Sequence, residues 1–166
     1  LAYPPTNDTT FYARIASGFR PGGVNDWRSA AARDVTVPPK YDSDTLWNYE
    51  VGVKSYMFDR ALYTELSAYR IDWSDQQIAL QDPNAIFAYI GNAGKSYVNG
   101  LELQINAQPT DSLTLNVGAT YTDSRLSEDM PVPPTPAPTP QNPNPAQPPY
   151  GFEGDRIPYS PKWAFA

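Results

Sequence analysis

The stretch from Tyr97 to Thr122 decides the fold. It consists of two arms, YVNGLELQINA over Tyr97–Ala107 and LTLNVGATYT over Leu113–Thr122. In both arms apolar and polar residues alternate over about ten residues, which is the pattern of a β-strand with one apolar and one polar face. Pro109 and the cluster Thr110–Ser112 separate the arms with residues that favour turns. The segment therefore predicts a tight antiparallel hairpin.

The polar face of this hairpin carries little charge. It holds Gly, Asn, Gln and Thr, with Glu102 as its one charged residue before Thr122. A half-buried sheet of a soluble protein usually presents many Lys, Glu and Arg to water, whereas the lumen of a transmembrane β-barrel accepts a polar, weakly charged wall. The hairpin alone leaves a soluble β-sandwich and a membrane barrel equally open.

Composition excludes several classes of protein. The 166 residues include no Cys and no His, so the chain offers no disulfide framework, no thiolate metal site and no histidine base. A net charge of −6 without a basic run argues against a nucleic-acid partner. No apolar run approaches the roughly 18 residues of a transmembrane helix, and no leader peptide opens the chain. The start at Leu1, without Met, indicates a piece of a longer protein.

Aromatic residues are abundant, with 12 Tyr, 4 Trp and 6 Phe. This excess is typical of the girdles that transmembrane barrels place at the membrane interfaces, although carbohydrate-binding modules share it. The same alternation recurs along the chain. It predicts strands near residues 9–20, 46–57, 61–73, 97–108, 113–123 and 158–166.

The connections between these strands differ systematically in length. Short turns follow the strands at 46–57 and 97–108, and long loops cover 21–45, 75–96 and 124–157. Residues 131–149 hold ten of the 19 prolines, which favours polyproline II or disorder there. Outer-membrane barrels have short periplasmic turns and long extracellular loops. The pattern therefore predicts an all-β, antiparallel transmembrane β-barrel segment of about six strands.

The residues also resemble a known family, the TonB-dependent outer-membrane receptors. Five segments match its motifs in the family's order, each weak alone. They are Phe11–Arg14 with Ser17–Gly23 ("YxRxSxGFRPGG"), Tyr49–Lys54 ("YExGxK"), Tyr69–Trp73 ("FYIDY"), Asn92–Glu102 ("NAG…xGxE") and Arg156–Trp163 ("LPxxPxW").

This resemblance implies a barrel of about 22 strands with an N-terminal plug domain in its lumen. Such a receptor lies in the outer membrane of a Gram-negative bacterium and imports a scarce nutrient, such as an iron–siderophore complex, with energy supplied through TonB. The chain matches the C-terminal half of the barrel, and the plug, the TonB box and the last strands have no counterpart in it. Six strands cannot close around a plug. We therefore expect a fragment whose partners are outer-membrane lipid, its own plug domain, the TonB complex and a small-molecule nutrient.

Two groups of residues are candidates for a site. The first lies at or beyond the outward strand ends, where aromatic stacking and charged hydrogen bonds are able to hold a ligand; interface anchoring and loop packing are the favoured alternative. The second faces the lumen, where it is placed to contact the plug; cross-strand ion pairing is the favoured alternative. The first group is Arg20, Trp27, Arg28, Trp73 and Tyr89, and the second is Arg14, Glu50, Lys54 and Glu102.

No catalytic, metal or cofactor site is expected. The spacing of Asp72, Asp75 and Asp82 along the chain is not that of a known cation-binding loop. No pocket or spacing in the sequence supports Glu65 and Glu102 as the carboxylate pair of a glycosidase. Two other functions stay open, a secreted carbohydrate-binding β-domain and a passive porin. The sequence does not name the cargo, since siderophore, cobalamin and oligosaccharide all fit.

Overall fold

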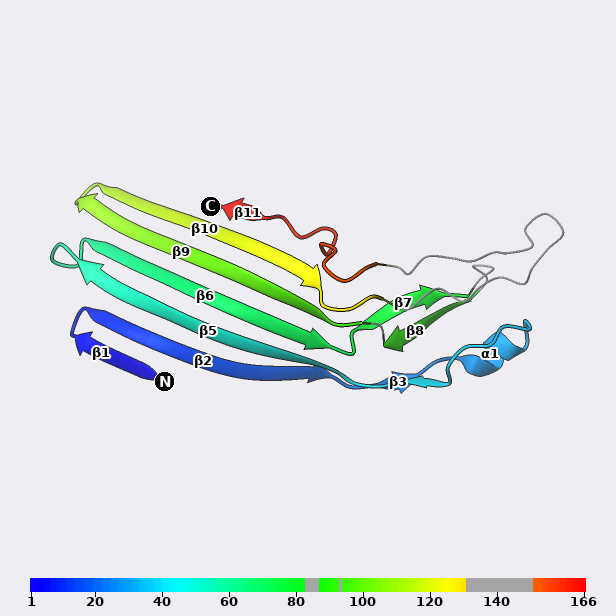
Figure 1. Cartoon of the computed structure of the whole chain (residues 1–166). Helices are drawn as coiled ribbons and strands as arrows, with labels where there is room; N and C mark the ends of the chain where they lie inside the picture. The colour runs from blue at the N-terminus through cyan, green and yellow to red at the C-terminus, as the bar shows by residue number, and fades with distance from the viewer. Residues whose placement is uncertain (83–86, 93, 131–150) are drawn as a thin grey trace.

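The computed structural model describes residues 1–82, 87–92, 94–130 and 151–166. The proline-rich segment expected at 131–149 lies outside the described residues. One large antiparallel sheet dominates the fold, with the strand order β1-β2-β5-β6-β9-β10-β11 (Figure 1). Its strands are β1 (Ala2–Thr6), β2 (Thr9–Arg20), β5 (Asp44–Met57), β6 (Leu62–Ser74), β9 (Ser96–Thr110), β10 (Leu113–Leu126) and β11 (Trp163–Phe165).

The two ends of this sheet differ. Turns of a few residues join β1 to β2, β5 to β6 and β9 to β10 at one end, which we call the short-turn end. The longer connections extend from the opposite end, the long-loop end (Figure 1). They contain small elements of their own: β3 (Gly23–Val24), α1 (Trp27–Ala31), β4 (Lys40–Tyr41), β7 (Gln77–Gln81) and β8 (Ala88–Asn92).

Four local features differ from the sequence-based expectation. β1 lies outside the predicted strands; it contains Pro4 and Pro5 and lies at the sheet edge, where prolines are tolerated. The connection 75–96 contains the hairpin β7–β8. β9 runs through Pro109, so the turn before β10 is only Asp111 and Ser112. The strand expected at 158–166 is reduced to β11, because Pro158 and Pro161 interrupt pairing.

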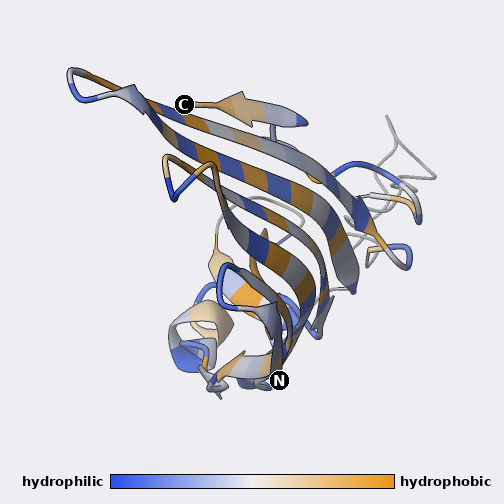
Figure 2. Ribbon diagram, turned by 90° about the vertical axis from the view of Figure 1, so that its left-hand side faces the viewer, coloured by the Kyte–Doolittle hydropathy of each residue, from blue (hydrophilic) through white to orange (hydrophobic). Residues whose placement is uncertain are grey.

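The register places all apolar faces on one side of the sheet. Cross-strand pairs link Phe11 with Val53, Val53 with Leu66, and Leu66 with Leu103. Figure 2 shows the result as alternating hydrophobic and hydrophilic bands across a curved sheet. We call the apolar side the outer face and the opposite side the inner face.

The described residues form no packed core over the outer face. Ile15 is 68% exposed, Val51 57% and Leu101 50%. Among the described residues, the buried apolar side chains lie elsewhere, at the long-loop end: Ala30, Val35, Val37, Leu80 and Leu126. A soluble sandwich would pack such faces against each other, so this arrangement disfavours the carbohydrate-binding β-domain. No helix in the described ranges is long and apolar enough to cross a membrane.

Candidate functional site

A buried carboxylate organises the long-loop end. Asp44 opens β5 and its side chain is only 2% exposed. Arg20, at the end of β2, donates to it from the backbone N–H at 3.1 Å and from Nε at 2.8 Å, and its terminal guanidinium nitrogen contacts the same carboxylate. Trp73 Nε1 and the Gln77 backbone N–H complete the set at 3.1 and 3.3 Å. Five donors from β2, β6 and β7 thus surround the Asp44 carboxylate at the start of β5.

Arg20 and Trp73, both predicted as ligand-binding residues, come together here. The Arg20 guanidinium carbon lies 5.2 Å from the centre of the Trp73 ring. Both residues line a cavity of about 510 Å³ between the β7–β8 hairpin and the segment after β10. Apolar side chains, among them Leu80, Leu126 and Ile157, form much of the remaining wall. The cavity therefore joins a stacking surface and a cation to an apolar interior, which is the usual make-up of a small-molecule site.

The other three predicted residues lie apart from this cavity. Trp27 and Arg28 are neighbours on α1, with the Arg28 guanidinium carbon 5.3 Å from the Trp27 ring centre. Tyr89, on β8, packs against the small core of the α1 segment. The structure therefore divides the expected group into a pair at the cavity and three residues in the long loops.

Residues that the sequence did not single out hold the long loops together. Asn25 donates from Nδ2 to the Ile90 carbonyl at 2.8 Å and accepts the Ile90 N–H at 2.9 Å. Asn92 donates to the carbonyls of Asp42 and Asp75 at 2.9 and 2.8 Å. These amides join loop 21–45 to loop 75–96. Loop asparagines are too common for the sequence to reveal such pairs.

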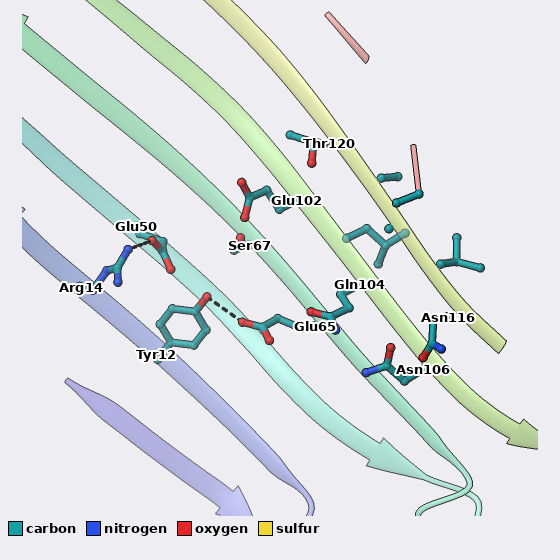
Figure 3. A pocket seen from close by; sticks show the side chains of 15 residues that line it. Tyr12, Arg14, Glu50, Glu65, Ser67, Glu102, Gln104, Asn106, Asn116 and Thr120 are labelled. Carbon is teal, nitrogen blue, oxygen red and sulfur yellow. Dashed lines mark hydrogen bonds and ion pairs between the residues drawn. The ribbon is translucent and has the colours of Figure 1, made fainter. Parts of the chain in front are cut away.

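The inner face carries a charged network over β2, β5 and β6 (Figure 3). Arg14 pairs with Glu50 at 2.7 Å. Glu65 accepts from Lys54 at 3.0 Å, Tyr12 at 3.3 Å and Tyr63 at 2.6 Å. Arg14, Glu50 and Lys54, three of the residues predicted to face the lumen, thus form cross-strand ion pairs on the inner face.

Glu102, the fourth lumen-facing candidate, differs from the others. It lies on β9 along the same inner wall and makes no hydrogen bond or ion pair with the described residues (Figure 3). It lines a hollow of about 550 Å³ on the inner face, whose wall also includes Arg14, Glu50 and Glu65. The residues directly opposite Glu102 on the two neighbouring strands, Ser67 and Thr120, are uncharged. Glu102 therefore presents to the inner face a carboxylate that has no partner among the described residues.

Two glycines let tyrosine rings lie flat on the inner wall. Tyr12 stands opposite Gly52 and Tyr69 opposite Gly100. A Cβ atom at either glycine would fall on the opposing tyrosine ring. These pairs keep large side chains from projecting into the lumen. Among the residues that the structure describes, no group of three metal-ligating side chains is placed to hold an ion.

Comparisons with known proteins agree with this architecture. The family model "TonB dependent receptor-like, beta-barrel" matches residues 1–166. A probable TonB-dependent siderophore receptor PiuA of Acinetobacter baumannii is 25% identical over 130 residues, which are 78% of this chain and 17% of that receptor.

Two solved structures share the fold. The ferric yersiniabactin uptake receptor FyuA from Yersinia pestis superposes with a TM-score of 0.68 at 18% identity, covering 99% of this chain and 21% of FyuA. The siderophore receptor PiuA from Acinetobacter baumannii gives 0.63 at 21% identity, covering 99% of this chain and 22% of that receptor. The chain thus spans about a fifth of the length of these receptors. It belongs to the TonB-dependent receptor family and forms a segment of its β-barrel.

Proposed function

We propose that this chain is part of an outer-membrane transporter that binds a scarce nutrient, such as a siderophore complex, and imports it with energy supplied through TonB. The cavity beside Arg20 and Trp73 carries the proposal, because it lies at the long-loop end, which is the extracellular end in this family. The similar proteins support the cargo class, since PiuA is a siderophore receptor and FyuA is an uptake receptor for ferric yersiniabactin. The proposed activity is transport rather than catalysis.

The inner face would contact the plug domain. Movement of the plug would then open the path for the nutrient. Glu102 supports this part of the proposal, since a carboxylate without a partner on the wall is suited to a cation on the plug. Arg14, Glu50 and Lys54 would contribute less, because each already has a partner on the barrel.

The test uses the full-length receptor in iron-starved cells. Uptake of a panel of radiolabelled ferric siderophores, ferric yersiniabactin included, is measured with and without a functional TonB. We expect at least one complex to accumulate only with TonB. Accumulation that persists without TonB would support a passive porin instead.

A pair of variants locates the site. Trp73→Ala removes the stacking surface and is expected to weaken binding about tenfold, which corresponds to about 1.4 kcal/mol. Phe58→Ala is the matched control, because Phe58 is an exposed aromatic residue at the short-turn end. If the two variants bind the siderophore with equal affinity, the cavity is not the binding site.

A further inference from the structure

Two asparagine side chains bind the loop backbone as a neighbouring β-strand would. In an antiparallel ladder, the two residues of a hydrogen-bonded pair exchange both N–H···O bonds. The Asn25 side-chain amide exchanges the same two bonds with Ile90, at 2.8 and 2.9 Å. The Asn92 amide does so with Asp42, at 2.9 and 2.7 Å. These reciprocal bonds join the loop between β2 and β5 to the loop between β6 and β9.

Gln77 attaches these joined loops to the ends of the long strands. It opens β7 directly opposite Asn92, and its Nε2 donates at 3.0 Å to the Asp42 carbonyl that Asn92 also contacts. The same nitrogen donates to the carbonyls of Pro21 and Arg20 at 3.0 and 3.3 Å. One side-chain amide thus contacts the chain where it leaves β2 and where it approaches β5.

The backbone of Gln77 holds the cation of the cavity. Its carbonyl accepts from a terminal guanidinium nitrogen of Arg20 at 3.2 Å, and its N–H donates to Asp44 at 3.3 Å. Asp44 binds the same guanidinium, which lies over the Trp73 ring. The orientation of Arg20 on this ring is therefore fixed by a carboxylate on β5 and by a carbonyl on β7.

Side chains supply much of the attachment of the β7–β8 hairpin to the rest of the long-loop end. The hairpin forms a two-stranded sheet of its own, and in the described part of the chain neither of its strands pairs with a strand of the large sheet. Loss of the Gln77 amide would therefore loosen the hairpin, and with it the carbonyl that holds Arg20.

We propose that Gln77 is a positioning residue of the cavity, which keeps the Arg20 guanidinium stacked on Trp73 and makes the two joined loops open as one unit. The loops then do not move independently of the cavity wall. The effect on ligand binding rests on the proposed function, because a positioned cation matters for transport only if the cavity binds the nutrient.

Hydrogen exchange of the ligand-free, full-length receptor in detergent tests the link between the loops. Gln77→Met keeps the length of the side chain but removes its donor. We expect exchange at least tenfold faster at the amides of Asp42 and Ile90, although the Ile90 N–H is bonded to Asn25 rather than to Gln77. Gln81→Met is the matched control, because Gln81 ends the same strand, is exposed and makes no side-chain hydrogen bond with the described residues.

A second variant approaches the link from the other loop. Asn25→Ala removes both side-chain bonds to Ile90 and is expected to speed exchange at Asp42 about as much as at Ile90. Faster exchange confined to the residues beside each substitution would show that the loops open separately, and it would overturn the proposal. Equal exchange in Gln77→Met and Gln81→Met would overturn it as well.

Uptake kinetics distinguish positioning from a general structural role. For the ferric complex that the wild-type receptor takes up from the panel above, Gln77→Met is expected to raise the half-saturating concentration at least fivefold, with a maximal rate within twofold of wild type. A lower maximal rate at an unchanged half-saturating concentration would contradict positioning. If the wild type takes up no complex, the transport proposal fails, whereas hydrogen exchange still decides whether Gln77 links the loops.

Discussion

At the scale of single residues, Asp44 has the most demanding environment. Asp44 is the first of the 14 residues of β5, whereas tilted strands cross the hydrocarbon with about 9–11 residues. Its contact with Gln77 in the connection 75–96 places it at the loop end of the strand, outside the hydrocarbon. The hydrogen bonds from Arg20, followed by those from Gln77 and Trp73, lower the pKa of Asp44 to about 2 despite its burial. The carboxylate therefore stays charged and keeps the cavity wall in place.

Asp44→Asn in the full-length receptor should loosen this end. Losing the charge weakens several hydrogen bonds, so the free energy of local opening should fall by about 1–2 kcal/mol at pH 7. Because the pKa is lowered on folding, the charge contributes fully above about pH 4 and its contribution disappears as the pH falls toward 2. Hydrogen exchange of residues 73–77 measures both effects. A difference between wild type and variant that persists unchanged at pH 2 would contradict this role.

Gly100 is the second residue with a specific requirement. Gly100→Ala places a methyl group on the Tyr69 ring, and displacing that ring should destabilise the full-length barrel by about 1–3 kcal/mol. Gly118→Ala on the neighbouring strand is the control, because its Cβ would meet only Ala166 at 3.7 Å. Unfolding in denaturant from lipid vesicles measures both. Equal stability of the two variants would argue against close packing at Gly100.

At the scale of elements, alternation was a sufficient guide to the long strands. A period of two over ten or more residues leaves few other structures open, and β2 covers the residues expected from it. Alternation does not predict the short elements. β7 and β8 have five residues each and exist because they pair with each other, while Asp44 gained its partners from strands far apart in sequence. Local pattern carries no information about such contacts.

The two faces of β9 and β10 should respond differently to charge. Leu103→Lys or Val117→Lys puts a cation on the outer face and should disfavour assembly by about 2–4 kcal/mol if the position is near the membrane midplane. Asn116→Asp faces the lumen and should be mild. Folding yield into lipid vesicles and unfolding in denaturant measure the difference. Equal costs on both faces would contradict the assignment.

At the scale of the whole molecule, the sheet presents three surfaces of different chemistry. Within the described part of the chain, the outer face is apolar and uncovered, the inner face is polar and carries Glu102 without a partner, and the long-loop end forms a cavity. Family membership places this sheet in the outer membrane of Gram-negative bacteria, with its outer face against lipid. In the closed barrel, both sheet edges would be paired, as lipid requires.

The most direct test of this account compares neighbouring residues on opposite faces of β10. The 166 residues contain no Cys, so single cysteines at Val117 and Asn116 give unique labels within this segment. Spin labels at both positions of the full-length receptor in outer-membrane vesicles are exposed to oxygen and to a water-soluble nickel complex. We predict that the Val117 label collides mainly with oxygen and the Asn116 label mainly with the nickel complex. Preferential collision with the nickel complex at Val117 would contradict the barrel assignment.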